Sequence, residues 1–179
     1  MPGLRLIIVA IGFLSASVFA QDNAELEQMY RSDQTARQSQ PVNWQELNEQ
    51  DADRRERVLA ILQDGDIRSA KDYFHAAMIF QHGNTPDHIR LAHSFATIAA
   101  SLDPGLPNAN WLKAATWDRL LLNFNQPQWY GTQFVRDADG NLTLYKMQPD
   151  VISDEQRAAW SVPTVAESLR ALEQRKNTN

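Results

Sequence analysis

The sequence contains no cysteine, only seven glycines and no cluster of basic residues. Without thiols the protein cannot use disulfides, a cysteine nucleophile or thiolate metal ligands. Acidic residues outnumber basic ones, 22 to 17, which argues against binding to nucleic acid or to anionic lipid. The sequence has neither a glycine-rich phosphate loop nor a Gly-x-Ser-x-Gly element, so nothing supports nucleotide binding or serine hydrolysis.

A long apolar run occurs only at the start of the chain. Arg5 is followed by apolar residues 6–18 and by Val18-Phe19-Ala20, which has the small-residue pattern of a signal-peptide cleavage site. We therefore expect residues 1–20 to be a signal peptide and residues 21–179 to form a single α-helical domain. The run is too short for a comfortable membrane span. The expected location is periplasmic or secreted, with no membrane attachment after cleavage.

Helical periodicity covers most of residues 22–125. It predicts helices over about 22–38, 44–62, 67–81, 85–102 and 111–125, the first two opened by Asp22 and Asn43 as N-caps. Residues 48–57 are almost all charged or polar, so we expect this stretch to face solvent, or its helix to be interrupted near Asp51. The three later helices are strongly apolar and joined by short turns, which indicates an antiparallel arrangement.

After residue 131 the pattern changes to alternation. Residues 132–136 and 142–147 flank Asp139-Gly140, which is typical of a β-hairpin, here at about 132–147. Ser153 and Thr164 open two final short helices. The sequence thus predicts a mainly α fold, a helical bundle of stacked α-hairpins with one small β-hairpin. We expect four tryptophans to lie in the core: Trp44, Trp111, Trp117 and Trp160.

Four short motifs occur in order between residues 33 and 134. They are Asp33-Gln34-Thr35-Ala36-Arg37, Gln81-His82, Asp118-Arg119 and Pro127-Gln128-Trp129-Tyr130-Gly131-Thr132-Gln133. In this order and spacing the sequence resembles the bacterial domain-of-unknown-function family 6624, whose pattern combines DQ-x-x-R, QH, DR and PQ-x-YGTQ elements. Because that family has no established activity, the resemblance implies a helical fold and a shared site but no reaction.

All four histidines lie between residues 75 and 93. His75 and His82 are seven residues apart, on one face of one helix, while His93 on the next helix and Asp118 on the third could approach them. Such a set suits a general base or a metal site, with His82, His75 and Asp118 as the catalytic candidates. The alternative is that these histidines are ordinary core or turn residues, since no HExxH or HxH spacing is present. We expect no metal or other cofactor, and keep a divalent metal on His75, His82, His93 and Asp118 as the weaker alternative.

Two charged pairs stand out. Asp118 and Arg119 lie on an otherwise apolar helix, where each charge needs a partner, and a structural ion pair is the simplest interpretation. Adjacent helical residues point about 100° apart, so the two side chains should serve different partners. Asp33 and Arg37 can form a surface bridge across one helical turn. The resemblance favours a second possibility, that Arg37 turns inward to meet the loop after residue 127.

Residues 128–133, named here the amide loop, place two amides, a hydroxyl and two aromatic rings around Gly131. Such a loop suits a small polar ligand. Alternatively Gly131 supplies a special backbone angle, while Gln128 and Gln133 satisfy buried main-chain groups. Connection lengths in an antiparallel bundle place His82, Asp118, Arg119 and this loop at one end. There the end of a helix would favour the charged form of His82.

Two functional hypotheses follow. The first is a non-enzymatic periplasmic binding or interaction module, whose polar cleft is formed by the amide loop and whose partner is a small polar ligand or a protein. Its expected ligand-binding residues are Arg37, His82, Asp118, Arg119, Gln128, Tyr130 and Gln133. The second is a hydrolase that uses His75, His82 or His93 with Asp118, with or without a metal. The sequence leaves open whether the protein is an enzyme, and its oligomeric state.

Overall fold

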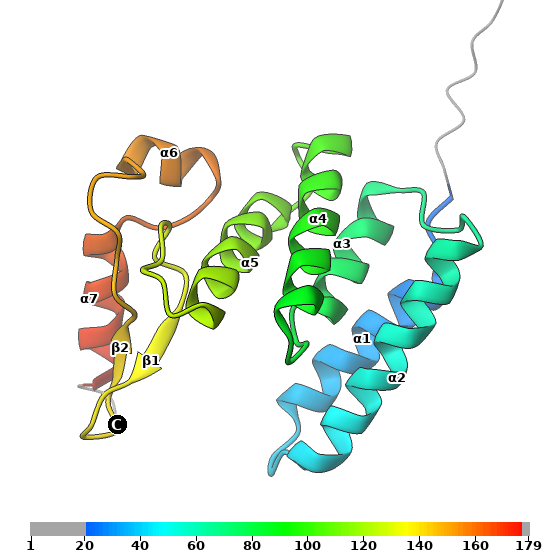
Figure 1. The fold of residues 1–179 in the computed structure, drawn as a ribbon, viewed down its shortest axis with the longest axis horizontal. Coiled ribbons are helices and arrows are strands. Elements are labelled where there is room, and N and C mark those ends of the chain that lie inside the picture. Colours follow the sequence, from blue (N-terminus) through cyan, green and yellow to red (C-terminus); the bar gives the residue numbers. More distant parts are fainter. Residues whose placement is uncertain (1–20, 177–179) are drawn as a thin grey trace, which may run out of the picture.

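The computed structural model describes residues 21–176 and is mainly α-helical (Figure 1). Within these residues the chain forms seven helices and one two-stranded antiparallel sheet, which confirms the predicted fold class. The expected signal peptide lies outside the described residues. The first five helices are α1 (Ala24–Gln38), α2 (Trp44–Gln63), α3 (Ala70–Phe80), α4 (Pro86–Leu102) and α5 (Ala109–Asn123).

The remaining elements are short. Strands β1 (Phe134–Arg136) and β2 (Leu142–Leu144) pair antiparallel with Val135 opposite Thr143, and they are followed by α6 (Asp154–Ala159) and α7 (Val165–Lys176). Residues 137–141 form the turn, where Asp137 Oδ1 accepts the N–H groups of Asp139 and Asn141. The strands end earlier than predicted on the side away from this turn, because there the main chain of Gln128 pairs with Lys146 and Gln148. The hairpin and α7 lie at one end of the molecule and the α1–α2 pair at the other, with α3, α4 and α5 between them (Figure 1).

Local side-chain chemistry explains most helix starts. Asn43 caps α2 as predicted, and Ser153 and Thr164 accept the N–H groups of Gln156 and Glu167. The cap of α1 is different from the one predicted. Asn23 accepts the N–H groups of Glu25 and Leu26, whereas Asp22 pairs with Lys71 on α3.

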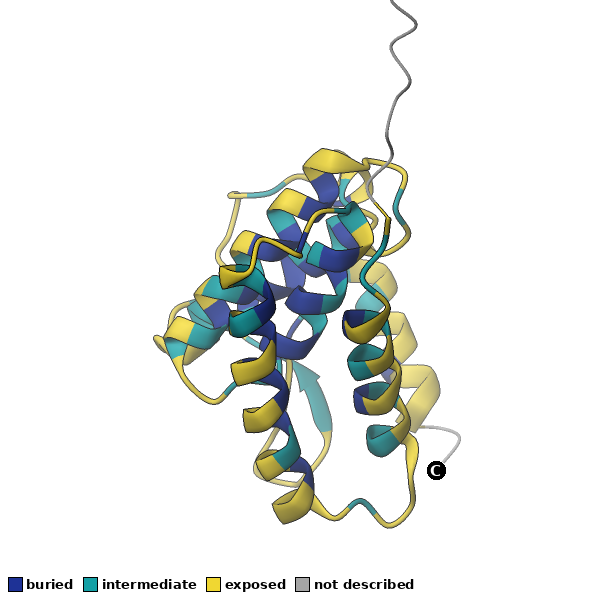
Figure 2. Ribbon diagram, turned by 90° about the vertical axis from the view of Figure 1, so that its right-hand side faces the viewer, coloured by how far each residue is buried: buried dark blue, intermediate teal, exposed yellow. Residues whose placement is uncertain are grey.

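The main core lies where α4 packs between α3 and α5, and where α1 packs on α3. The buried stretches of these helices face one another, while the exposed stretches point outward (Figure 2). A smaller apolar cluster joins α5 to the C-terminal segment, where the rings of Tyr130 and Trp160 stack at 4.7 Å between centroids. Three tryptophans pack at the edge of this cluster or of the main core, as expected, but Trp44 is 62% exposed and is not a core residue.

Candidate functional site

Helices α1 and α2 are joined by paired charges rather than by apolar contacts alone. Arg37 Nη2 donates to Asp33 Oδ1 on its own helix at 3.0 Å and to Asp51 Oδ2 on α2 at 2.5 Å. Arg54 Nη1 donates to Asp51 Oδ1 at 2.9 Å and lies 3.6 Å from Asp33 Oδ1. Each carboxylate therefore faces two guanidinium groups, which is what burial of an acid requires.

These charges lie inside the molecule. Asp33 is fully buried, Asp51 is 3% exposed, and Arg54 and Arg55 are also buried. Two expectations were therefore wrong, the first of them in part. Helix α2 is continuous through Asp51, and one face of its charged middle, formed by Asp51, Arg54 and Arg55, is buried, while the opposite face is exposed to solvent as expected. The Asp33–Arg37 pair is a buried contact rather than a surface bridge, because Asp51 on the neighbouring helix completes it.

His82 follows the end of α3 and faces the same charges. Its Nε2 atom lies 3.6 Å from Asp33 Oδ2 and has no hydrogen-bond partner among residues 21–176. Burial, followed by the positive charges of Arg37 and Arg119, lowers the pKa of His82 to about 3. The expectation that His82 carries a charge was therefore wrong. Desolvation and two nearby guanidinium groups outweigh the favourable end of the helix, so His82 is neutral at physiological pH.

Arg119 on α5 reaches the same region from the other side. Its Nη1 donates to the main-chain oxygen of Gln81 at 2.6 Å, and its Nε donates to Gln133 Oε1 at 3.3 Å. Burial, and then repulsion by the charge of Arg37, lower the pKa of Arg119. Arg119 therefore joins the residue before His82 to the amide loop, and it lies within electrostatic reach of Arg37.

Arg55 on α2 is a further arginine close to these charges. The residue is only 8% exposed, yet its side chain has no hydrogen bond or ion pair within the described part of the chain. Burial is the main reason why its pKa is lowered. The charge of Asp51 opposes that shift and the charge of Arg37 adds to it. A guanidinium group presents five N–H donors, and those of Arg55 are not among the buried atoms that lack a partner, so they reach solvent and are open to an external anion.

We name Arg37, Arg54, Arg55 and Arg119, with Asp33, Asp51 and His82, the arginine cluster. The cluster contains four guanidinium groups and two carboxylates, and only Arg37 and Arg54 pair with these carboxylates; because His82 is neutral, the cluster carries an excess charge of +2. The glycine before α4 shapes its edge. A Cβ at Gly83 would lie 2.2 Å from the Cβ of His88, so only glycine lets this turn pack so tightly on α4.

Asp118, the neighbour of Arg119, performs a different task. Its carboxylate accepts the main-chain N–H groups of Trp129, Tyr130 and Thr132 at 2.8 to 3.2 Å and the Thr132 hydroxyl at 2.8 Å. Asp118 and Arg119 serve different partners, as their angular separation predicts, but the expected ion pair was wrong. Asp118 is paired with main-chain dipoles and fixes the amide loop against α5.

The amide loop is buried. Gln128 is fully buried, and its amide donates to the main-chain oxygens of Gln133 and Tyr145 while its Oε1 accepts the Gln133 N–H. Gly131 adopts a φ of 83°, which other residues rarely tolerate. The structure therefore favours the second of the two alternatives, in which Gly131 supplies a special backbone angle and Gln128 satisfies buried main-chain groups. Tyr130 is also buried, which leaves Gln133, through Arg119, as the link to the arginine cluster.

The other histidines lie elsewhere. His93 Nδ1 contacts the main-chain oxygen of Lys113 and the Thr116 hydroxyl, and the His75 ring stacks on Tyr30 at 4.6 Å between centroids. Residues 21–176 contain no group of three or more histidine, aspartate and glutamate side chains that could hold a metal ion. The proposed set of His75, His82, His93 and Asp118 therefore does not converge.

Sequence reasoning did not assign Asp51, Arg54 or Arg55 to a site, and it named Gln81 only as part of a motif. A usable signal was present, because a helix with a charged middle and apolar residues at both ends can bury its charges only against a complementary neighbour. Arg37, one of the residues that the resemblance singled out, does turn inward. It meets Asp51 instead of the amide loop.

None of the helices among residues 21–176 is long and apolar enough to cross a membrane. Comparison of the chain with protein-family models, with curated proteins and with solved structures gives no match.

Proposed function

We propose that this protein is an exported, non-enzymatic binding module whose ligand is a small oxyanion, a carboxylate or a phosphate, held at the arginine cluster. The single observation that carries the proposal is Arg55, which is largely covered yet has a guanidinium group open to solvent and no hydrogen bond or ion pair among residues 21–176, beside a cluster of excess positive charge. A second group points the same way, since the buried Nε of Arg37 also lacks a partner among the described residues. An oxyanion supplies the acceptors that these donors lack.

The type of ligand follows from the donor chemistry. Guanidinium forks match the paired oxygens of carboxylates and phosphates, and such charge-assisted bonds are the strong class of hydrogen bond. Neutral His82 contributes a further polar atom to the cluster, its Nε2, which has no hydrogen-bond partner among the described residues. In this proposal the amide loop acts indirectly, since Gln133 holds the guanidinium of Arg119 in place.

Binding is preferred to hydrolysis for a chemical reason. A general base works best when its pKa lies near the working pH, and His82 has a pKa of about 3. His75 lies against Tyr30, and Asp118 is engaged by main-chain N–H groups, so neither joins His82 in a catalytic set. The hydrolase alternative has a direct test. Stoichiometric zinc, manganese or iron in protein purified without chelator would favour it over the binding module.

The proposal also includes the cellular location of the protein and its relation to a family. The signal-like residues 1–20 support export to the periplasm or the exterior, and the four motifs support kinship with family 6624.

The decisive experiment is calorimetric titration of residues 21–179 with acetate, succinate, inorganic phosphate and sulfate at fixed ionic strength. We expect saturable binding of at least one of these anions, and the succinate and phosphate titrations tell a carboxylate site from a phosphate site. Arg55→Gln should weaken that binding about 10- to 100-fold, as loss of a charge-assisted hydrogen bond predicts. It removes no hydrogen bond within the described protein, so the fold should survive.

Arg57→Gln is the matched control, because Arg57 lies two residues away and pairs with exposed Glu25. It should leave anion affinity unchanged. The proposal fails if no anion binds saturably, or if the two variants weaken binding equally.

A further inference from the structure

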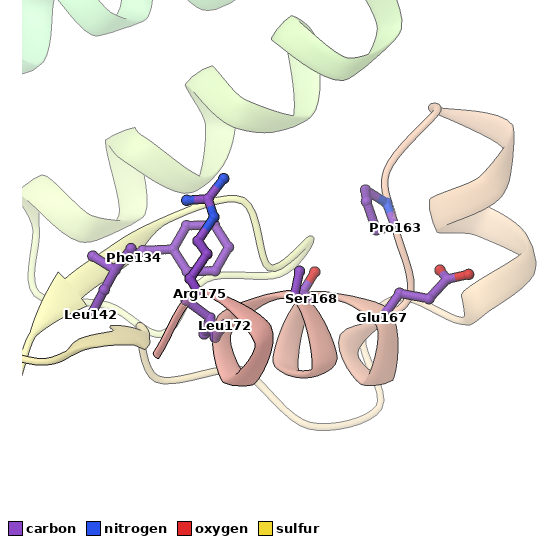
Figure 3. A pocket seen from close by; sticks show the side chains of 8 residues that line it. Phe134, Leu142, Pro163, Glu167, Ser168, Leu172 and Arg175 are labelled. Atoms are coloured by element: carbon purple, nitrogen blue, oxygen red, sulfur yellow. The ribbon is translucent and has the colours of Figure 1, made fainter. Parts of the chain in front are cut away.

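A hollow lies between the β-hairpin and α7, far along the chain from the arginine cluster. It has a volume of about 540 Å³, within the range of small-molecule sites. Its wall is mainly apolar, with Phe134 and Leu142 from the strands and Ala171 and Leu172 from α7. Arg175 lies beside Phe134 and Leu142 at one end, and Pro163 and Glu167 lie at the other (Figure 3). Glu167 and Arg175 are eight residues apart on α7, about 12 Å along the helix.

The Arg175 end opens onto a basic hollow. This adjoining space of about 450 Å³ shares Leu142, Leu172 and Arg175 with the first, and adds Arg136 and Lys176. None of these three basic side chains forms an ion pair within residues 21–176. Arg136 donates a hydrogen bond to the main-chain oxygen of Gly140, but in the part of the chain that the structure describes no carboxylate pairs with any of the three cations, although the net charge of the sequence is −5.

The nearby acids are already engaged. Glu167 Oε2 accepts the main-chain N–H and the hydroxyl of Thr164, as part of the cap of α7. The charge of Lys176 contributes to the lowered pKa of Asp137, but Asp137 Oδ1 accepts the N–H groups of Asp139 and Asn141. The basic end is therefore left to an external anion.

We propose that these joined hollows bind an amphiphile with one alkyl chain and one carboxylate, a medium-chain fatty acid. The chain lies against Phe134, Leu142 and Leu172 and runs toward Pro163. The carboxylate lies between Arg175, Arg136 and Lys176. An apolar wall that ends at unpaired cations matches a ligand with one apolar and one anionic end. It does not match a purely apolar partner, which would leave the cations unused, or a short anion, which would leave the apolar wall exposed.

The test uses residues 21–179 and a homologous series of hexanoate, octanoate and decanoate below their micelle concentrations. Each methylene buried against the apolar wall should tighten the Kd about fourfold. Decanol lacks the charge and should bind at least tenfold more weakly than decanoate. A flat response along the series, or equal binding of decanol, would overturn the proposal.

Two variants test the placement. Ala171→Trp fills the hollow from an exposed helix position and should abolish decanoate binding. Arg175→Gln should weaken decanoate binding about tenfold or more without affecting decanol. The control is Arg170→Gln on the same helix, since Arg170 lines neither hollow. Because basic residues in the last turn also suit the helix dipole, ligand affinity is the readout rather than stability. Equal affinity of Arg175→Gln and Arg170→Gln would count against the site.

Self-association is the competing explanation of the apolar wall. If Ala171→Trp converts a dimer to a monomer in sedimentation while decanoate fails to bind, the surface is an interface between copies of this chain and the proposal is wrong. The inference does not depend on the proposed function. Arg55→Gln should leave decanoate binding unchanged, and Ala171→Trp should leave the binding of short anions unchanged, so either site can fail alone.

Discussion

Arg37 on α1 donates from Nη2 to Asp51 on α2 at 2.5 Å, across 14 residues of sequence, and the same nitrogen donates to Asp33 at 3.0 Å. One guanidinium group thus bridges two buried carboxylates on neighbouring helices, and Arg54 supplies the second positive charge. The contact makes the α1–α2 pair depend on charge as well as on apolar packing. It also positions Arg37 where its charge acts on His82 and Arg119.

Arg37→Met should therefore destabilise the protein by about 3 to 5 kcal/mol, because it leaves two buried carboxylates with one fewer partner each. The free energy of unfolding in urea measures this loss. Arg31→Met is the control, since Arg31 forms an exposed pair with Glu27 one turn away and its removal should cost at most about 0.5 kcal/mol. A loss below about 1 kcal/mol for Arg37→Met would contradict the buried network.

His82 should make the protein less stable in acid. Its pKa is about 3 in the folded protein, against 6.5 for a solvated histidine in the unfolded chain. As the pH falls below 6.5 the unfolded state takes up a proton that the folded state refuses, so stability declines until the pH reaches the folded pKa. The slope from this one group is at most about 1.4 kcal/mol per pH unit.

Unfolding measurements between pH 7 and pH 4 on the wild type and on His82→Gln isolate this contribution, because other acids and histidines titrate in both proteins. We expect a shallower decline in the variant. Nuclear magnetic resonance gives a direct check: the His82 ring signal should not titrate above pH 4. A midpoint near 6.5 would show that His82 is solvated.

Asp118→Asn should lower the free energy of unfolding by about 3 kcal/mol. The amide keeps one acceptor oxygen but turns an NH2 group toward N–H groups that the carboxylate now accepts. The rings of Trp117 and Trp129 lie 5.0 Å apart, so a loosened amide loop should also change tryptophan fluorescence in the native state. Asp87→Asn, at an exposed carboxylate, should change neither quantity.

Gln128→Ala should destabilise the protein by about 3 kcal/mol, because three main-chain groups lose their partner and a cavity forms. Gln126→Ala, two residues earlier and exposed, should cost less than about 0.5 kcal/mol. Thermal unfolding of both variants provides the comparison. If the two variants are equally stable, Gln128 has no structural role, and its interpretation as a ligand-binding residue is favoured instead.

Export should remove residues 1–20. Intact-mass measurement of protein from the exported fraction of a bacterial host should give a chain that begins at Gln21. An exported protein that retains Met1 would be inconsistent with the expected signal peptide.

The local features of this protein were readable from its sequence. Asn43, Ser153 and Thr164 cap their helices because a short polar side chain can reach an N–H group two or three residues ahead in any context. The apolar periodicity of α3, α4 and α5 predicted a mainly α fold, since that pattern depends only on neighbours along one helix.

The environment of each charge was decided by tertiary packing. Asp51 and Arg54 would lie on an ordinary solvated face if α2 stood alone, and they form a buried network because α1 brings Asp33 and Arg37 against them. Arg119 donates to the main-chain oxygen of Gln81, 38 residues away, and Gln128 donates to that of Tyr145, 17 residues away. Whether a polar side chain is solvated, paired or left with unused donors depends on what packs beside it, and periodicity along the chain carries no information about that neighbour.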